Sequence, residues 1–187
     1  MKKILFAASE CVPFIKTGGL ADVVGSLPKC FDKEKYDVRV IIPKYMCMDE
    51  KWKSQMKYVN HFYMDLCWRR QYVGILEMEY EGVKFYFIDN EYYFAGPSPY
   101  SDVRYDLEKF AFFSRAVLSA LPVIDFRPDI IHCHDYHTGL IPVYLKDSFS
   151  VGDFYKGVKS IMTIHNLKFQ GVWDIDTCLL YTSDAAD

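Results

Sequence analysis

A lysine and two adjacent glycines follow the first apolar run of the chain, within S-E-C-V-P-F-I-K-T-G-G-L-A-D-V-V-G-S-L-P-K. Gly18 and Gly19 have no side chains, so their backbone N–H groups can come close to a ligand. The helix predicted to begin there offers unpaired amides and its positive dipole end to an anion, and Lys16 adds a full charge. The pattern is neither a P-loop nor a dinucleotide fingerprint. An anion-binding loop and a tight turn beside an exposed lysine both remain open.

Three histidines and an aspartate are concentrated in the stretch H-C-H-D-Y-H. His132 and His134 alternate on a predicted strand and point to the same side, Asp135 follows where the strand ends, and His137 opens the next helix. These residues fit a hydrolytic zinc site. They fit equally a sugar or leaving-group site, in which the carboxylate accepts hydrogen bonds and the imidazoles donate them. His132 is also interpretable as a satisfied core residue.

The stretch T-I-H-N-L-K-F-Q-G ends a further predicted strand with His165 and Asn166, and Gln170 and Gly171 follow. Amide and imidazole groups on a glycine-bearing loop suit recognition of a polyhydroxylated ligand better than binding of a metal. The stretch therefore favours a sugar site.

The elements that must position these groups alternate between strands and helices. Apolar runs predict strands at 3–9, 37–43, 129–135 and 157–166, and helical periodicity appears at 19–31 and 138–147. This alternation predicts a Rossmann-like, doubly wound parallel sheet, in which ligands gather at the carboxyl ends of the strands. All three polar stretches should therefore lie at one edge of the sheet.

Between the second and third of these strands the pattern changes. Aromatic and β-branched runs at 58–66, 70–80 and 83–90 predict a local antiparallel insertion, with a hairpin turn at Glu81 and Gly82. Asp106 is then expected to cap a long helix whose apolar positions recur at spacings of three and four: Phe110, Phe113, Val117, Leu118 and Leu121.

Composition limits the classes of partner. The chain has 187 residues, 51% of them hydrophobic, and a net charge of −3, which gives no reason to expect a nucleic-acid or polybasic membrane partner. Its N-terminal apolar run is too short for a signal sequence, and no transmembrane-length run occurs, so we expect a cytoplasmic protein. The six cysteines are scattered, which predicts reduced and mostly buried thiols.

Taken in order, these stretches resemble the N-terminal part of bacterial-type glycogen or starch synthases. The resemblance covers residues 2–173 and rests on the following motifs: I-L-F-A-A-S-E-C-V-P-F-I-K-T-G-G-L-A-D-V-V-G-S-L-P-K, D-V-R-V-I-I-P-K-Y, F-Y-F-I-D-N-E-Y-Y-F, F-A-F-F-S-R-A-V-L, R-P-D-I-I-H-C-H-D-Y-H-T-G-L-I-P-V-Y-L and T-I-H-N-L-K-F-Q-G-V-W. It implies the N-terminal half of a glycosyltransferase-B architecture. The implied reaction transfers glucose from ADP-glucose to the non-reducing end of an α-1,4-glucan (glycogen or a maltooligosaccharide) with retention, without a metal or other cofactor.

The resemblance also assigns roles to individual residues. Lys16, Gly18 and Gly19 match the family's donor-binding motif and would hold the phosphates of ADP-glucose and the nearby glucosyl unit. Asp135 and His165 would line the glucose pocket and act in catalysis. The remaining implied substrate-binding residues are Tyr100, near the donor, and Asn166 and Gln170.

The chain also departs from the family pattern. Residues 1–174 correspond to an incomplete N-terminal domain, because the half that carries further basic residues and a catalytic glutamate does not follow, so this chain alone is expected to be nearly inactive. Residues 175–187 do not resemble the family's continuation and are expected to be an unassigned or non-native tail.

Two other functions remain open beside the glucosyltransferase. One is a metal-dependent hydrolase that uses His132, His134 and His137, although H-x-H-D-x-H differs from the H-x-H-x-D-H of metallo-hydrolases. The other is a non-catalytic glucan-binding module, which predicts binding of maltooligosaccharide but not of ADP-glucose.

Overall fold

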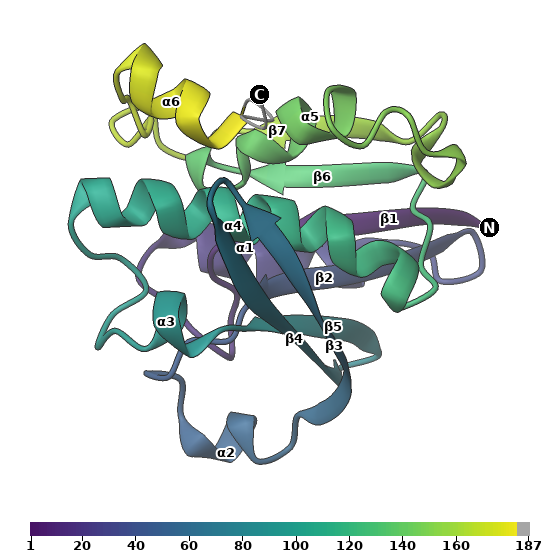
Figure 1. Cartoon of the computed structure of the whole chain (residues 1–187). Coiled ribbons are helices and arrows are strands. Elements are labelled where there is room, and N and C mark those ends of the chain that lie inside the picture. Colours follow the sequence, from purple (N-terminus) through teal and green to yellow (C-terminus); the bar gives the residue numbers. More distant parts are fainter. Residues whose placement is uncertain (183–187) are drawn as a thin grey trace.

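The computed structural model describes residues 1–182, and within them seven strands form one sheet (Figure 1). The strands are β1 (Lys2–Ala7), β2 (Tyr36–Pro43), β3 (Lys57–Leu66), β4 (Arg69–Tyr80), β5 (Val83–Asp89), β6 (Ile130–His134) and β7 (Lys159–Thr163). Their spatial order is β3-β4-β5-β2-β1-β6-β7. The run from β5 to β7 is parallel, whereas β3, β4 and β5 pair antiparallel.

Helices cover both faces of this sheet. They are α1 (Gly19–Ser26), α2 (Glu50–Lys53), α3 (Glu91–Phe94), α4 (Val103–Val123), α5 (Leu140–Lys146) and α6 (Ile175–Thr182), with short 3-10 turns at Leu27–Cys30, Tyr136–Thr138 and Asp153–Tyr155. Figure 1 shows α4 crossing in front of the strands and α1 behind them. The predicted doubly wound α/β fold is therefore confirmed.

The central strands are apolar on both faces because both faces are covered. Leu5, Phe6 and Ala7 of β1 are fully buried, as are Val40 and Ile41 of β2. A strand buried on both sides requires a continuous apolar run rather than an alternating one. The sequence signal and the position in the sheet therefore agree.

The antiparallel segment is present as predicted, and it is continuous with the main sheet. β5 pairs antiparallel with β4 and parallel with β2, so the hairpin strands extend the main sheet. The turn between β4 and β5 is Glu81-Gly82, and both residues have positive φ (49° and 73°). Two consecutive positive φ angles match the two-residue turn that suits the twist of a hairpin.

The prediction that Asp106 caps the long helix was wrong. Helix α4 begins at Val103, and Asp102 is the cap, with its side chain accepting a hydrogen bond from the backbone N–H of Arg104. Asp106 lies one turn further on and is buried, where it accepts hydrogen bonds from the backbone N–H and hydroxyl of Ser101. Both aspartates precede the same apolar periodicity, so spacing alone did not distinguish the cap from a buried anchor.

Most of the cysteines whose side chains the structure describes are not buried. Cys11 and Cys133 are buried, and burial raises the pKa of each thiol to about 12. Cys30 and Cys47 are exposed and Cys67 is half-buried, which corrects the expectation of mostly buried thiols. The side chain of Cys178 lies outside the described residues.

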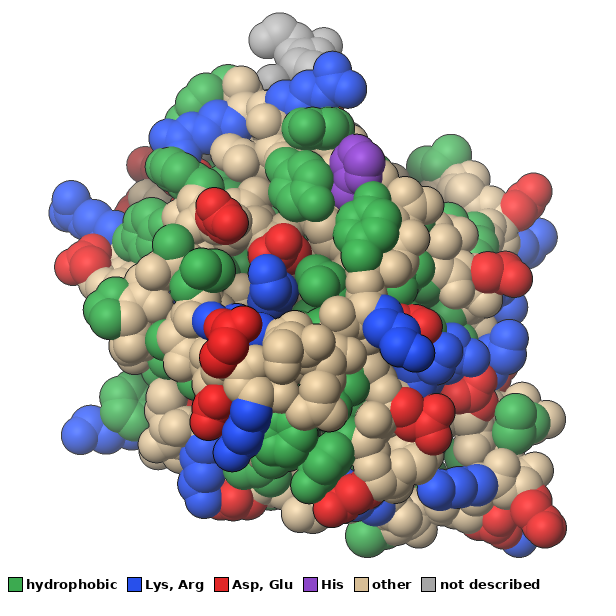
Figure 2. Space-filling model, turned by 90° about the horizontal axis from the view of Figure 1, so that it is seen from below, with side chains coloured by type: hydrophobic (Ala, Val, Ile, Leu, Met, Phe, Trp, Pro, Cys, Tyr) green, Lys and Arg blue, Asp and Glu red, His purple; other side chains and the backbone are tan. Residues whose placement is uncertain are grey.

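The surface carries charges of both signs. Figure 2 shows Lys and Arg side chains interspersed with Asp and Glu on the face seen from below, in keeping with the small net charge. Within residues 1–182, no helix has the length and apolar character needed to cross a membrane. Residues 183–187 of the expected tail lie outside the described residues, and the division at residue 174 stays a prediction.

Candidate functional site

Three of the predicted stretches meet at the carboxyl edge of the sheet. β1 lies beside β6, with Ala7 opposite Cys133, and β6 lies beside β7, with His134 opposite Thr163. The residues that follow these strands therefore leave the sheet at the same edge. Among them are the glycine loop, Asp135 and His165, which is the arrangement expected from strand polarity.

A buried carboxylate binds the residue that precedes the glycines of the loop. Glu10 is 2% exposed, and its Oε2 accepts hydrogen bonds from the backbone N–H of Thr17 (2.5 Å) and from the Thr17 hydroxyl (2.7 Å). These two bonds fix the backbone immediately before Gly18, which is the N-cap of α1. Glu10 was not among the predicted site residues, since one glutamate after a strand gives no periodic signal.

Neither glycine of the loop is required by the backbone in this structure. Gly18 has φ −149° and ψ −167°, an extended conformation open to any residue, and a Cβ at Gly18 would find its nearest neighbour, Glu10 Oε1, at 3.7 Å. A Cβ at Gly19 would meet nothing within 4 Å. The missing side chains thus keep open space at the first turn of α1, which is the space that a ligand close to the backbone would use.

Lys16 is directed at that same helix turn. Its Nζ lies 2.7 Å from both carboxylate oxygens of Asp22, and both side chains are 52% exposed. An exposed pair of this kind is weak, because water and salt screen it. An anion bound at the start of α1 could therefore draw Lys16 away from Asp22 at small cost.

Asp135 adopts a strained backbone conformation at the end of β6. Its φ is 56° and its ψ is 178°, a region that residues other than glycine rarely occupy. The buried side chain accepts, at Oδ1, a hydrogen bond from the backbone N–H of His165 (2.7 Å), and the Asp135 backbone N–H donates to the carbonyl of Thr163 (2.9 Å). The strand ends are thereby joined with a carboxylate fixed between them.

Three imidazoles form a stack that leads from the sheet to this edge. The rings of His132 and His134 have centroids 4.2 Å apart, and those of His134 and His165 are 5.2 Å apart and nearly parallel. His134 Nδ1 lies 2.9 Å from His165 Nε2, and His132 Nε2 lies 2.7 Å from the hydroxyl of Thr163. The prediction that His132 and His134 lie on one side of the strand is confirmed, whereas their contact with His165 was not predicted.

Burial disfavours the charged forms of His132 and His134. It lowers the pKa of His134 to about 3, with further lowering by His132 and His165, and it lowers the pKa of His132. Desolvation disfavours the cation because the charged ring would lose its water without gaining an anionic partner.

Tyr100 lies between the loop after β1 and the 3-10 turn after β6. Its ring stacks on His137 at a centroid distance of 4.8 Å, and its hydroxyl is 2.8 Å from Ser9 Oγ. Burial raises the pKa of the Tyr100 hydroxyl and lowers that of His137 to about 3. Tyr100 therefore contacts two of the polar stretches, as a packed and neutral side chain.

A buried ion pair anchors the loop that carries Tyr100. Lys109 of α4 donates to the carbonyl of Pro99 (2.7 Å) and pairs with Asp106 (2.6 Å), and the two charged side chains are 3% and 4% exposed. Asp106 also binds Ser101, so both flanks of Tyr100 are tied to α4.

Among the described residues, neither Asn166 nor Gln170 forms a side-chain hydrogen bond with another predicted site residue. Asn166 Oδ1 accepts from the backbone N–H of Lys168, and Gln170 Nε2 donates to the carbonyl of Leu167. Both side chains are exposed in the loop after β7. Gln170 also lines a cavity of about 250 Å³ with neighbours that include Trp173. Their assigned role in substrate binding stays a prediction.

The three histidines of the hydrolase hypothesis do not converge. His132 and His134 stack towards His165, whereas His137 packs against Tyr100 and Phe110. Among the side chains that the structure describes, no group of three or more His, Cys, Asp or Glu has the geometry to hold a metal ion. The geometry gives the hydrolase no support.

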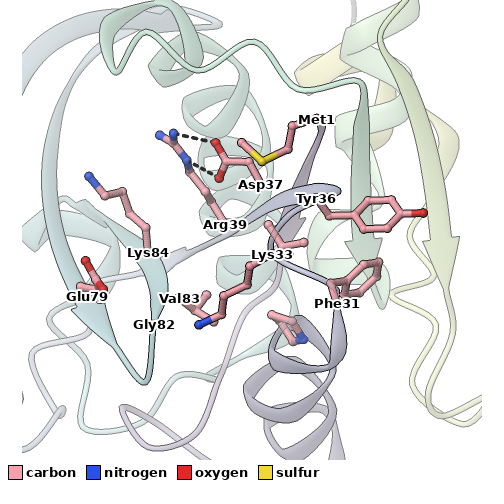
Figure 3. A pocket seen from close by; sticks show the side chains of 12 residues that line it. Met1, Phe31, Lys33, Tyr36, Asp37, Arg39, Glu79, Gly82, Val83 and Lys84 are labelled. Atoms are coloured by element: carbon pink, nitrogen blue, oxygen red, sulfur yellow. Dashed lines mark hydrogen bonds and ion pairs between the residues drawn. The ribbon is translucent and has the colours of Figure 1, made fainter.

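Another cavity of about 250 Å³ opens at the opposite edge of the sheet, where β2 and β5 begin (Figure 3). Arg39 lies in it but is bound by both carboxylate oxygens of Asp37, and Lys84 pairs with Glu77. Since strand polarity puts this cavity away from Asp135 and the glycine loop, it is not part of the candidate site.

Comparison with known proteins agrees with the geometry. The family model described as the starch synthase catalytic domain matches residues 3–185. Glycogen synthase of Lachnospira eligens is 69% identical over 175 residues, which cover 94% of this chain and 37% of that protein, and glycogen synthase of Anoxybacillus flavithermus is 52% identical over 171 residues, covering 91% and 35%.

A solved structure shows the same fold. The catalytic domain of starch synthase IV from Arabidopsis thaliana, bound to ADP and acarbose, superposes with a TM-score of 0.76 at 28% identity, covering 95% of this chain and 36% of that one. The chain thus spans little more than a third of the length of the relatives it matches. On its sequence and its fold, the chain belongs to the starch synthase catalytic domain family.

Proposed function

We propose that the chain is part of an enzyme that transfers glucose from ADP-glucose to the non-reducing end of an α-1,4-glucan, with retention of configuration. The observation that carries the proposal is the open space at Gly18 and Gly19, beside Lys16 and on the same edge as Asp135 and His165. The glycogen synthase relatives, and the ADP and acarbose bound to the Arabidopsis starch synthase, support this donor and acceptor class.

The glycine loop receives the phosphates of the donor. The amides at the first turn of α1 donate to phosphate oxygens, and Lys16 leaves Asp22 to neutralise the charge that grows on the departing ADP. Glu10 keeps the loop rigid by binding Thr17, so little ordering is needed when the donor binds.

The glucosyl group lies towards Asp135 and His165. A carboxylate fixed in this position stabilises the positive charge that develops on the sugar ring as the bond to ADP breaks. His165 donates a hydrogen bond to a sugar hydroxyl, and its backbone is fixed by Asp135. The two residues act as a unit because the carboxylate that faces the sugar also orients the histidine.

Calorimetric titration of ADP-glucose into the EDTA-treated chain tests the donor site. We expect binding that Lys16→Ala weakens about tenfold or more, the order expected for a hydrogen bond to a charged group. Lys51→Ala is the matched control, since Lys51 is also exposed (62%, against 52% for Lys16) and also pairs with a nearby aspartate. Binding of maltooligosaccharide without ADP-glucose would instead favour a glucan-binding module.

A chimera tests the reaction itself. Residues 3–173 of this chain replace the matching segment of the Lachnospira eligens glycogen synthase, to which the chain is 69% identical. We expect this chimera to transfer glucose from ADP-glucose to maltoheptaose. A folded chimera without transferase activity, beside an active parent, would contradict the proposal.

A further inference from the structure

The ring of His134 packs against the rings of Phe6 and His132 and has one polar contact, to His165. The side chain is fully buried, and its ring plane makes angles of 24° with Phe6, 31° with His132 and 16° with His165. Its Nδ1 lies 2.9 Å from His165 Nε2. Among the described residues its other nitrogen, Nε2, has no hydrogen-bond partner.

This enclosure decides which nitrogen of His134 carries the proton. A proton on Nε2 would be an orphaned buried donor, and buried N–H groups without a partner are rare because they lose a full hydrogen bond to water. The face of Phe6 is not placed to accept it either, since the N–H lies in the plane of the His134 ring and the Phe6 ring is inclined to that plane by only 24°. A proton on Nδ1 is instead donated to His165.

The surroundings of His134 also disfavour a second proton on its ring. His132 covers one face and is itself held by the hydroxyl of Thr163. Protonation of both nitrogens would restore the orphaned donor, and burial opposes it by lowering the pKa of His134 to about 3. His134 is therefore a neutral donor to His165 throughout the neutral pH range.

We propose that His134 is a positioning residue: its Nδ1–H donates to Nε2 of His165 and thereby keeps the proton of His165 on Nδ1. His165 then presents a hydrogen-bond donor, not an acceptor, on the side away from His134. Among the described residues, the Nδ1 of His165 has no hydrogen-bond partner. Its backbone is bound by Asp135 and its ring by His134, so both the position and the polarity of His165 are set before a ligand arrives.

The target of this donor is a hydroxyl of the transferred sugar, a step that rests on the proposed function. A fixed donor discriminates between ligands, because a group that can only donate would clash with the Nδ1–H. The placement of the proton itself depends only on the structure of the chain.

The tautomers can be read directly by NMR. A long-range ¹H–¹⁵N correlation spectrum of the ¹⁵N-histidine-labelled chain at pH 7, without ligand, separates protonated from bare ring nitrogens. The chain has five histidines, so single substitutions assign every signal. We expect the Nδ1–H form of His165 to exceed the Nε2–H form by about tenfold, the ratio that corresponds to about 1.4 kcal/mol.

Three variants separate positioning from packing. His134→Phe keeps the stacked ring but removes the donor, and should shift His165 towards Nε2–H, the form that free histidine favours. His134→Asn places an amide N–H near the original Nδ1 and should restore the Nδ1–H form. Thr163→Val removes the partner of His132 without touching the His134–His165 pair, and should leave the tautomer unchanged.

The wild-type spectrum decides the question even where a variant does not fold. An Nε2–H tautomer at His165, or a proton on Nε2 of His134, overturns the proposal. The same holds for an Nδ1–H form that persists in a folded His134→Phe. If the tautomers are as stated while Lys16→Ala leaves ADP-glucose binding unaffected, the positioning role stands and the proposed donor site fails.

Discussion

The carboxylate of Asp135 accepts a hydrogen bond of 2.7 Å from the backbone N–H of His165, and so joins the ends of β6 and β7. Asp135 makes this bond from a backbone with φ 56°, which costs on the order of 1–3 kcal/mol. The two residues are 30 positions apart and are brought together only by the parallel pairing of their strands. Such strain concentrates where it serves a function, which makes Asp135 the first target for substitution.

Asp135→Asn should separate chemistry from fold. Asparagine tolerates positive φ and its carbonyl oxygen can still accept from His165, but the charge is lost. We expect the melting temperature of the chain to change by less than about 3 °C. In the chimera, kcat should fall by about a hundredfold or more, the order seen when electrostatic stabilisation of a transition state is removed. A chimera that keeps full kcat with asparagine would show that the charge is not used.

Gly19→Ala should weaken donor binding without harming the fold. A Cβ at this position meets nothing within 4 Å, and alanine favours a helix by up to about 1 kcal/mol over glycine. We therefore expect unchanged or increased stability in urea, together with weaker binding of ADP-glucose in calorimetry. Gly152→Ala, where the new Cβ would make an ordinary contact of 3.8 Å with Tyr155, is the control. If Gly19→Ala binds ADP-glucose as tightly as Gly152→Ala does, the donor does not occupy the space at Gly19.

Lys109→Met should be strongly destabilising. The substitution leaves Asp106 buried without its ion-pair partner and releases the carbonyl of Pro99. Removing one member of a buried pair costs about 3–5 kcal/mol, which urea unfolding followed by circular dichroism would measure. Lys35→Met, which removes the exposed partner of Asp32, should have a much smaller effect. If Lys109→Met changed the free energy of unfolding only slightly, the Asp106 carboxylate would have to be solvated by water in the variant.

Stability should decrease as the pH falls from 7 to 5. His137 has a folded-state pKa near 3 against an ordinary value of 6.5, so below pH 6.5 the unfolded chain takes up a proton that the folded chain does not. Its contribution is complete above 6.5 and is lost as the pH falls towards 3, with a loss of about 2 kcal/mol at pH 5.

His137→Phe should remove this part of the pH dependence. Phenylalanine fits the aromatic surroundings of Tyr100, Tyr136 and Phe110, and it does not titrate. Urea unfolding at pH 7 and pH 5 should give a difference smaller by about 2 kcal/mol than in the parent. His61→Phe, at an exposed position, is the matched control. An unaltered difference in His137→Phe would mean that folding does not lower the pKa of His137.

The fold class, the polarity of the strands and the edge at which the site lies could all be predicted from the amino-acid sequence. Continuous apolar runs such as that of β1 occur where a strand is covered on both faces, and parallel strands bring the residues that follow them to one edge. Local chemistry was equally informative where a turn imposed it, as at Glu81-Gly82.

The side chains that contact one another across that edge could be identified only in the folded chain. The bond of Glu10 to the glycine loop, the choice of Asp102 over Asp106 as helix cap, and the contact of His134 with His165 all depend on residues that no period or spacing connects. Periodicity reports which face of an element is buried, because burial of apolar surface acts on every residue of that face. A single hydrogen bond between distant residues leaves no repeating pattern, so it becomes visible only when the chain is folded.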